Sequence, residues 1–119
     1  KVFLLNRNEN TGRKEFKRLS NVYSKDTVHY GVPKVSPNII VQATSLGGTS
    51  EGLNLLDLLN INKEKVFNIN PVFIESVISN QPTELEFYAR NKGCLVITGK
   101  EFWKSQSESQ RIEWFKNIF

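Results

Sequence analysis

Short runs rich in β-branched and aromatic residues alternate along this chain with segments in which apolar residues recur every three or four positions. Runs of the first kind are typical of β-strands, whereas the second spacing places apolar side chains on one face of a helix. The runs that predict strands are residues 1–5, 27–32, 38–43, 66–69 and 94–98.

A helix is predicted over residues 11–24, because Phe16, Leu19 and Tyr23 share one face and basic residues lie between them. The Thr-x-x-Glu sequence at residues 83–86 has the form of a capping box and predicts the start of a shorter helix that ends near residue 93. The remaining predicted helices are residues 49–59, 70–78 and 107–119.

The predicted helix at 70–78 is expected to contribute to the core. Asn70 has the side chain of a helix cap, and Pro71 suits the first helical position, where no backbone N–H is needed. The apolar residues that follow are the predicted core residues of this helix, namely Phe73, Ile74 and Val77.

The order of these elements predicts an α/β fold. A strand, a helix, two strands, and then alternating helices and strands favour a three-layer domain with a mostly parallel four- to five-stranded sheet and helices on both faces. The chain has 119 residues, 39% of them hydrophobic, which suits one domain over residues 1–119. Because it begins with Lys1 and contains no Met, we expect it to be part of a longer protein.

The positive charge is concentrated near the start of the chain. Residues 1–34 contain eight Lys or Arg against three acids, whereas residues 35–119 contain eight against nine. A basic cluster of this kind predicts contacts to the phosphates of DNA or RNA, although a solvated helix face gives the same pattern. The candidate partner-binding residues are Arg7, Asn8, Arg13, Lys14, Lys17 and Arg18 in this region, together with Thr49 and Ser50 at the start of the helix predicted at 49–59.

Residue patterns that carry catalytic or metal chemistry are largely missing from the sequence. His29 is the only imidazole, and Cys94 is the only thiol, so neither an internal disulfide nor a clustered metal site is expected. The doublet Gly47-Gly48 lacks the Lys of a phosphate-binding loop. No apolar stretch of about 18 residues and no signal peptide is present. We therefore expect a non-enzymatic, intracellular domain that binds no metal, cofactor or membrane.

A metal-dependent nuclease remains an alternative. Such enzymes place an acid or Gln on a strand and a Lys two residues later, to hold Mg²⁺ and the attacking water. Gln42 fits the first position, but Thr44 stands where the Lys is needed. Residues 99–103 are similar to a segment of some nucleases, and this hypothesis predicts cleavage that depends on Glu84 or Glu86.

Residues 66–78 resemble the third strand-to-helix unit of BRCT domains, with Phe73 where that family usually has Trp. Residues 84–88 are similar to the acidic-then-aromatic segment that follows this unit. The resemblance implies a protein-interaction domain of a nuclear chromatin or DNA-repair protein, and hence a protein or peptide partner.

Some BRCT domains bind phosphopeptides through a hydroxyl after strand one and a Lys that starts helix two. The corresponding residues here are Asn6, Asn8 and Thr11 at the first place, and Thr49, Ser50 and Glu51 at the second. Since an acid repels a phosphate dianion, we expect partner binding without strict phosphate dependence.

A second resemblance is to response-regulator receivers. Residues 37–41 and 52–56 are similar to the phosphoacceptor strand and the helix after it, and Lys100 suits the conserved Lys of that family. Receivers need an acid pair after strand one and an Asp after strand three to bind Mg²⁺. This chain has residues 6–8, Asn-Arg-Asn, and residues 42–44, Gln-Ala-Thr, at these places, so the resemblance implies a degenerate receiver that acts as a binding domain.

Overall fold

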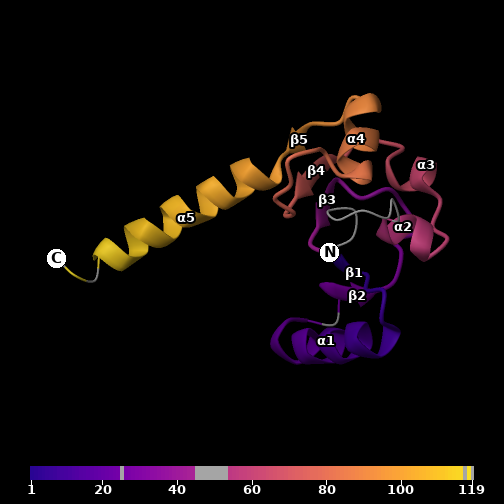
Figure 1. The fold of residues 1–119 in the computed structure, drawn as a ribbon. Coiled ribbons are helices and arrows are strands. Elements are labelled where there is room, and N and C mark those ends of the chain that lie inside the picture. The colour runs from indigo at the N-terminus through magenta and orange to yellow at the C-terminus, as the bar shows by residue number, and fades with distance from the viewer. Residues whose placement is uncertain (25, 45–53, 117, 119) are drawn as a thin grey trace.

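Residues 1–24, 26–44, 54–116 and 118 are described by the structure, which is a computed structural model. In chain order the elements are β1 (Val2–Leu4), α1 (Glu9–Val22), β2 (Val28–Tyr30), β3 (Ile39–Gln42), α2 (Leu55–Leu58), α3 (Lys63–Val66), β4 (Val72–Glu75), α4 (Glu84–Asn91), β5 (Val96–Ile97) and α5 (Gly99–Lys116) (Figure 1). All strand pairs in this part of the chain are parallel, which confirms the predicted α/β class.

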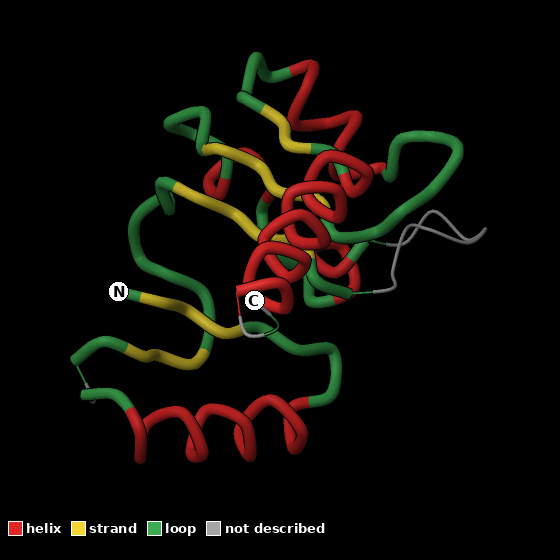
Figure 2. Tube along the Cα trace, turned by 90° about the vertical axis from the view of Figure 1, so that its left-hand side faces the viewer, coloured by secondary structure: helices red, strands yellow, loops and turns green. Residues whose placement is uncertain are grey.

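The strands form two small sheets, and the prediction of one four- to five-stranded sheet is wrong. β1 pairs with β2, and β4 lies between β3 and β5 in the second sheet. The two-stranded sheet lies between α1 and the three-stranded sheet (Figure 2). β1 has only three residues, and its Val2 and Phe3 side chains are exposed.

The core lies between the three-stranded sheet and the helices α2, α3 and α4. Phe73 of β4 is fully buried at its centre, and the ring of Phe67, at the end of α3, lies 5.9 Å from it between centroids. Tyr88 of α4 meets Phe67 edge-on at 5.2 Å. The other buried members of this cluster are Leu56, Leu85 and Ala89.

The opposite face of this sheet carries exposed apolar side chains. Ile39 and Val41 of β3 are 57% and 55% exposed, whereas Ile40 between them packs against the core. Among the described residues, α2, α3 and α4 therefore cover one face of this sheet, and the expected three layers are not formed there. α5 contacts β4 and then projects away from the rest of the molecule (Figure 1).

The prediction of a strand at 66–69 followed by a helix at 70–78 is wrong, because in the structure a helix comes first and a strand follows it. Residues 63–66 form α3, and Asn70 has a φ of 49°, a left-handed conformation that Asn tolerates better than most residues. Pro71 then precedes β4 rather than starting a helix. In β4 the side chains of Phe73 and Glu75 are fully buried, whereas those of Val72 and Ile74 are half-buried, which is the two-residue period of a strand.

Of the three predicted core residues, only Phe73 belongs to the buried core cluster of the described residues. Phe73 is fully buried, and Ile74 beside it in β4 is half-buried on the other face. Val77 is half-buried just after the strand. The expectation that they would share one face of a helix is wrong, because adjacent residues of a strand point to opposite faces.

α1 and α5 both begin earlier than predicted because of their caps. The Asn8 side chain accepts a hydrogen bond from the Thr11 N–H at 3.0 Å, so α1 begins at Glu9. The Thr98 N–H and hydroxyl both donate to Glu101 Oε2 at 2.8 Å, and the Glu101 N–H donates to Thr98 Oγ1 at 3.3 Å. This reciprocal capping box starts α5 at Gly99 instead of residue 107.

The helix predicted at 49–59 is seen only in part. α2 begins at Leu55, after the Asn54 side chain accepts a hydrogen bond from the Asp57 N–H at 3.0 Å. Residues 45–53, which include the expected caps, lie outside the described residues. No helix in the described part of the chain is long and apolar enough to cross a membrane.

Because Gly99 has no side chain, the start of α5 packs directly against the backbone that follows β4. A Cβ at Gly99 would lie 2.0 Å from the Val77 carbonyl oxygen, so Gly99→Ala must displace backbone. We expect the free energy of unfolding in urea to fall by about 2 kcal/mol, although Ala favours helices more than Gly does.

The exposed substitution Ser107→Ala in the same helix is the control, and it should leave the unfolding free energy unchanged or slightly higher. A Gly99→Ala protein as stable as the unsubstituted chain would contradict the described contact.

Candidate functional site

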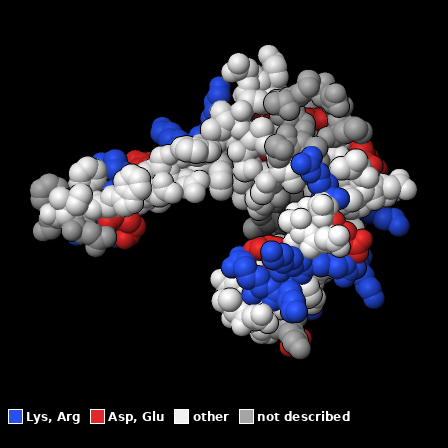
Figure 3. Space-filling model, turned by 60° about the horizontal axis from the view of Figure 1, so that its bottom comes forward, with Lys and Arg blue, Asp and Glu red and all other residues white. Residues whose placement is uncertain are grey.

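The basic residues singled out in the sequence come together on one helix, α1, except Arg7, which lies just before it. Figure 3 shows Lys and Arg side chains gathered on the surface formed by α1. We call this group the basic surface of α1, and all its members are exposed: Arg7, Arg13, Lys14, Lys17 and Arg18.

The packing of α1 on β2 fixes which way this surface points. Gly12 is buried, and a Cβ there would lie 2.6 Å from Tyr30 Cε2, so the helix approaches this strand closely. The Phe16 ring lies 6.4 Å from the Tyr30 ring, and the Arg13 guanidinium lies 5.0 Å from the Tyr30 centroid. With one side of α1 held in this way, the basic side chains of the other side face solvent.

Two of the five cations have carboxylate partners on the same helix. Arg13 Nη2 lies 2.7 Å from Glu9 Oε1, and Arg18 pairs with Glu15. The Arg18 hydrogen bond lowers the pKa of Glu15, so that carboxylate stays charged at neutral pH. Exposed pairs of this kind are weak and exchange readily with an external anion.

The remaining three cations of the basic surface are more available. Within the described part of the chain, Arg7, Lys14 and Lys17 take part in no ion pair. Asn8, in contrast, is occupied as the cap of α1. Thr49 and Ser50 lie outside the described residues, so the structure does not bring them to this surface.

A second polar cluster lies at the carboxyl edge of the three-stranded sheet, where ligands bind in many parallel α/β folds. Gln42 of β3 and Glu75 of β4 are register partners at this edge, and Thr98 follows β5. Gln42 is buried, and its backbone carbonyl accepts a hydrogen bond from the Ser76 hydroxyl at 2.7 Å. We call this cluster, completed by Thr83 and Glu86, the polar sheet edge.

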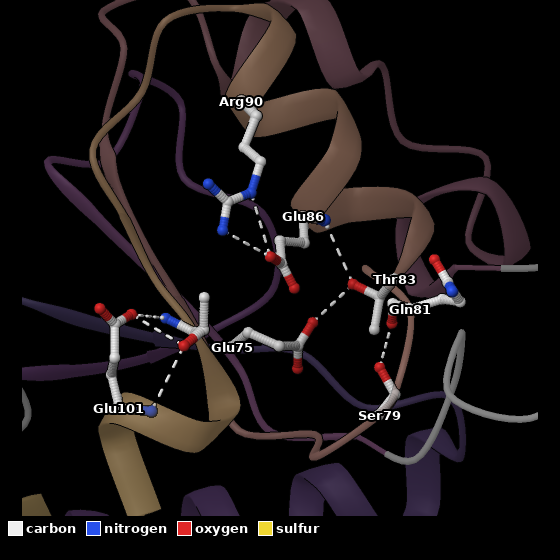
Figure 4. A network of polar contacts seen from close by, with 8 residues as sticks. Glu75, Ser79, Gln81, Thr83, Glu86, Arg90 and Glu101 are labelled. Atoms are coloured by element: carbon white, nitrogen blue, oxygen red, sulfur yellow. Dashed lines mark hydrogen bonds and ion pairs between the residues drawn. The ribbon is translucent and has the colours of Figure 1, made fainter.

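The carboxylate of Glu75 is fully buried yet has two donors, of which Figure 4 shows the Thr83 hydroxyl. The Val77 N–H donates to its Oε1 at 2.8 Å, and the Thr83 hydroxyl donates to its Oε2 at 2.7 Å. Thr83 Oγ1 also accepts from the Glu86 N–H at 3.2 Å, as a capping residue does. Burial raises the pKa of Glu75, an effect that these hydrogen bonds oppose and the negative charge of Glu86 reinforces.

The acids named for a nuclease are held apart by other partners. Glu84 Oε1 accepts from Lys63 Nζ at 3.2 Å, and Glu86 Oε1 accepts from Arg90 Nη2 at 2.8 Å. No group of three or more His, Cys, Asp or Glu that could hold a metal ion occurs among the described residues. Glu75 was missed as a candidate because its segment was assigned to a helix, whereas the β-forming run of residues 72–74 was the available signal.

The two remaining candidates from the sequence are His29 and Cys94, and both are partly buried against other residues. The His29 ring is half-buried and stacks on the Phe3 ring at 4.9 Å. Burial raises the pKa of the Cys94 thiol, which favours its protonated form. A small hollow of about 190 Å³ opens beside the polar sheet edge, with Glu86, Thr98 and Lys100 in its lining.

The raised pKa of Glu75 predicts a dependence of stability on pH. A carboxyl whose pKa is higher in the folded than in the unfolded chain stabilises the fold below the unfolded pKa, about 4.3, and loses this contribution as pH rises through the folded pKa. We therefore expect the stability of the unsubstituted chain relative to Glu75→Gln to decrease with rising pH over that interval.

Urea unfolding of both proteins at a series of pH values measures this difference. The exposed Glu108→Gln is the matched control and should show no such decrease relative to the unsubstituted chain. A constant difference between the unsubstituted chain and Glu75→Gln across the pH series would refute the raised pKa.

Comparisons of this chain with protein-family models, with curated proteins and with solved structures found no match. Neither the BRCT nor the receiver resemblance is therefore identified by a family match, and the assignment that stands is an α/β fold with parallel strands.

Proposed function

We propose that this chain is a nucleic-acid-binding domain that contacts phosphates through the basic surface of α1. The observation that carries the proposal is the exposure of five cations on and beside one helix, three of them without an ion pair in the described chain. Cations of this kind displace the counterions condensed on DNA or RNA, and the released ions supply most of the binding free energy.

The form of the surface suits the sugar-phosphate backbone. α1 has 14 residues and is about 21 Å long, so its cations can follow several phosphates along one strand. Residues three or four apart lie on the same side of a helix, which groups Arg13 with Lys17 and Lys14 with Arg18. Asn8 is occupied as a cap, and phosphate contacts by cations carry no sequence information, so we expect binding with little sequence preference.

The salt dependence of binding tests this proposal. Changing Lys14→Gln and Lys17→Gln together should weaken duplex binding about tenfold and make the slope of log affinity against log salt shallower by about two. The matched control is Lys65→Gln with Lys116→Gln, which removes the same charge from α3 and the end of α5. Fluorescence anisotropy with a labelled duplex measures both proteins.

An equal loss of affinity and slope in both double variants would show that the contact is not made by α1. A chain that binds no duplex at low salt would rule out the proposed function altogether.

A divalent-metal-dependent nuclease is the second candidate function, and one observation favours it. Gln42 and Glu75 lie side by side at the polar sheet edge, and amide and carboxylate oxygens are the ligands that Mg²⁺ prefers. In this proposal they would hold a divalent ion, and the chemistry that the ion would supply is the activation of a water toward a phosphodiester. Residues 45–53, which follow β3, lie outside the described residues.

Cleavage of labelled DNA with Mg²⁺ or Mn²⁺ tests the second candidate. We expect Glu75→Gln to lower the cleavage rate at least about tenfold, because it removes the negative charge of a metal ligand, while Glu108→Gln on α5 leaves the rate unchanged. The absence of cleavage by the unsubstituted chain with either metal would reject a nuclease and leave a binding domain.

The BRCT resemblance implies that the chain docks a protein partner, and a different surface supports this proposal. Ile39 and Val41 of β3 and Leu95 beside β5 are exposed apolar residues at one sheet, and such surfaces often form protein interfaces. The strand-to-helix unit at 66–78 no longer supports this proposal, because this segment contains the last residue of α3, a turn and then β4. A nuclear location belongs to the same proposal.

A further inference from the structure

Helix α5 carries a face on which cations and tryptophans occur together. The six residues of this face are separated along the sequence by three, one, three, four and three positions. These separations keep them within an arc of about 100° on an α-helix. We call them the α5 contact face: Lys100, Trp103, Lys104, Ser107, Arg111 and Trp114.

Every side chain of this face is exposed. Trp103 is 54% exposed and Trp114 is 67% exposed, although tryptophan is on average one of the more buried residues. α5 contacts β4 and then projects away from the rest of the molecule (Figure 1). The two rings are 11 residues apart, which corresponds to about 16 Å along the helix.

The charge of the α5 contact face has one sign. Lys100, Lys104 and Arg111 take part in no ion pair within the described part of the chain. The acids of the helix lie off this arc, where Glu101 accepts hydrogen bonds from Thr98. The remaining acids of α5 are Glu108 and Glu113. Three cations with no acid on the same face of the helix favour an anionic partner.

We propose that the α5 contact face binds single-stranded nucleic acid, with unpaired bases stacked on Trp103 and Trp114 and phosphates contacted by the three cations. The proposal rests on the proposed nucleic-acid binding and adds a second surface and a second ligand form. Aromatic side chains that stack on bases, combined with cations along the backbone, are the usual means of binding single strands. A duplex hides the faces of its bases, so tryptophans would contribute little there.

A lipid surface fits this face less well. Helices that lie in a membrane interface have their cations on one face and their large apolar residues on the opposite one. In α5 the cations and both tryptophans share a face, whereas Phe102 and Ile112 lie outside that arc. Charge and stacking surface on the same side match the alternation of phosphate and base along a nucleic-acid strand.

Binding of a labelled thymidine oligonucleotide of about 20 nucleotides tests the proposal by fluorescence anisotropy. We expect Trp103→Leu with Trp114→Leu to weaken single-strand binding at least about tenfold, and to change duplex binding much less. The matched control, Trp103→Phe with Trp114→Phe, keeps two rings that can stack and should retain most of the affinity. Both tryptophans are exposed, so the variants should unfold at the same urea concentration as the unsubstituted chain.

The outcomes separate this proposal from the proposed function. If the chain binds the duplex through α1 and the Leu variant binds the oligonucleotide as tightly as the unsubstituted chain, the α5 proposal alone is wrong. If the chain binds neither nucleic acid, both proposals are wrong. Binding to vesicles of phosphatidylcholine and phosphatidylserine without binding to the oligonucleotide would assign the face to lipid and overturn the proposal.

Discussion

The buried carboxylate of Glu75 determines how the last third of the chain is arranged. A buried carboxylate needs hydrogen-bond donors, and Glu75 finds them in the Val77 N–H directly after β4 and in the Thr83 hydroxyl before α4. Since Thr83 also caps α4, the end of the strand and the start of the helix are joined by one side chain. α4 is thereby placed so that Leu85 and Ala89 join the core around Phe73.

The same short segment sets the direction of α5. The carbonyl of Val77 lies where a Cβ on Gly99 would have to be, so the first residue of α5 packs directly on the backbone that follows β4. The capping box of Thr98 and Glu101 then fixes the start of the helix. With its first turn held by these contacts, the rest of α5 extends into solvent and displays its cations and tryptophans.

The sequence correctly predicted those helices and strands whose apolar periodicity or capping pattern fits only one kind of element. The basic helix, the strand at 38–43 and the helix after Thr83 are present, and each has either a clear apolar face or a cap pattern. The prediction for residues 66–78 was wrong because a short apolar run fits a strand and a helix equally well. The pair Asn70-Pro71 was interpreted as the cap and first residue of a helix. In the structure Asn70 has a positive φ and ends a turn, which no local pattern distinguishes from a cap.

The candidate sites differ in how far the sequence could predict them. The basic surface of α1 depends on charges within one helix, so the spacing of Lys and Arg was enough to predict it. The polar sheet edge depends on the register of β3 and β4, which pairs residues 33 positions apart, Gln42 and Glu75, and only the fold reveals it. The early start of α5 could have been found from the Thr-x-x-Glu pattern at 98–101.

The most direct test of the account is a footprint of lysine reactivity with and without a DNA duplex, read by mass spectrometry after brief acetylation. If the basic surface of α1 binds phosphates, Lys14 and Lys17 should become protected when the duplex is added, while Lys65 on α3 reacts as before. Unchanged reactivity of Lys14 and Lys17 under conditions in which the duplex is bound would contradict the account.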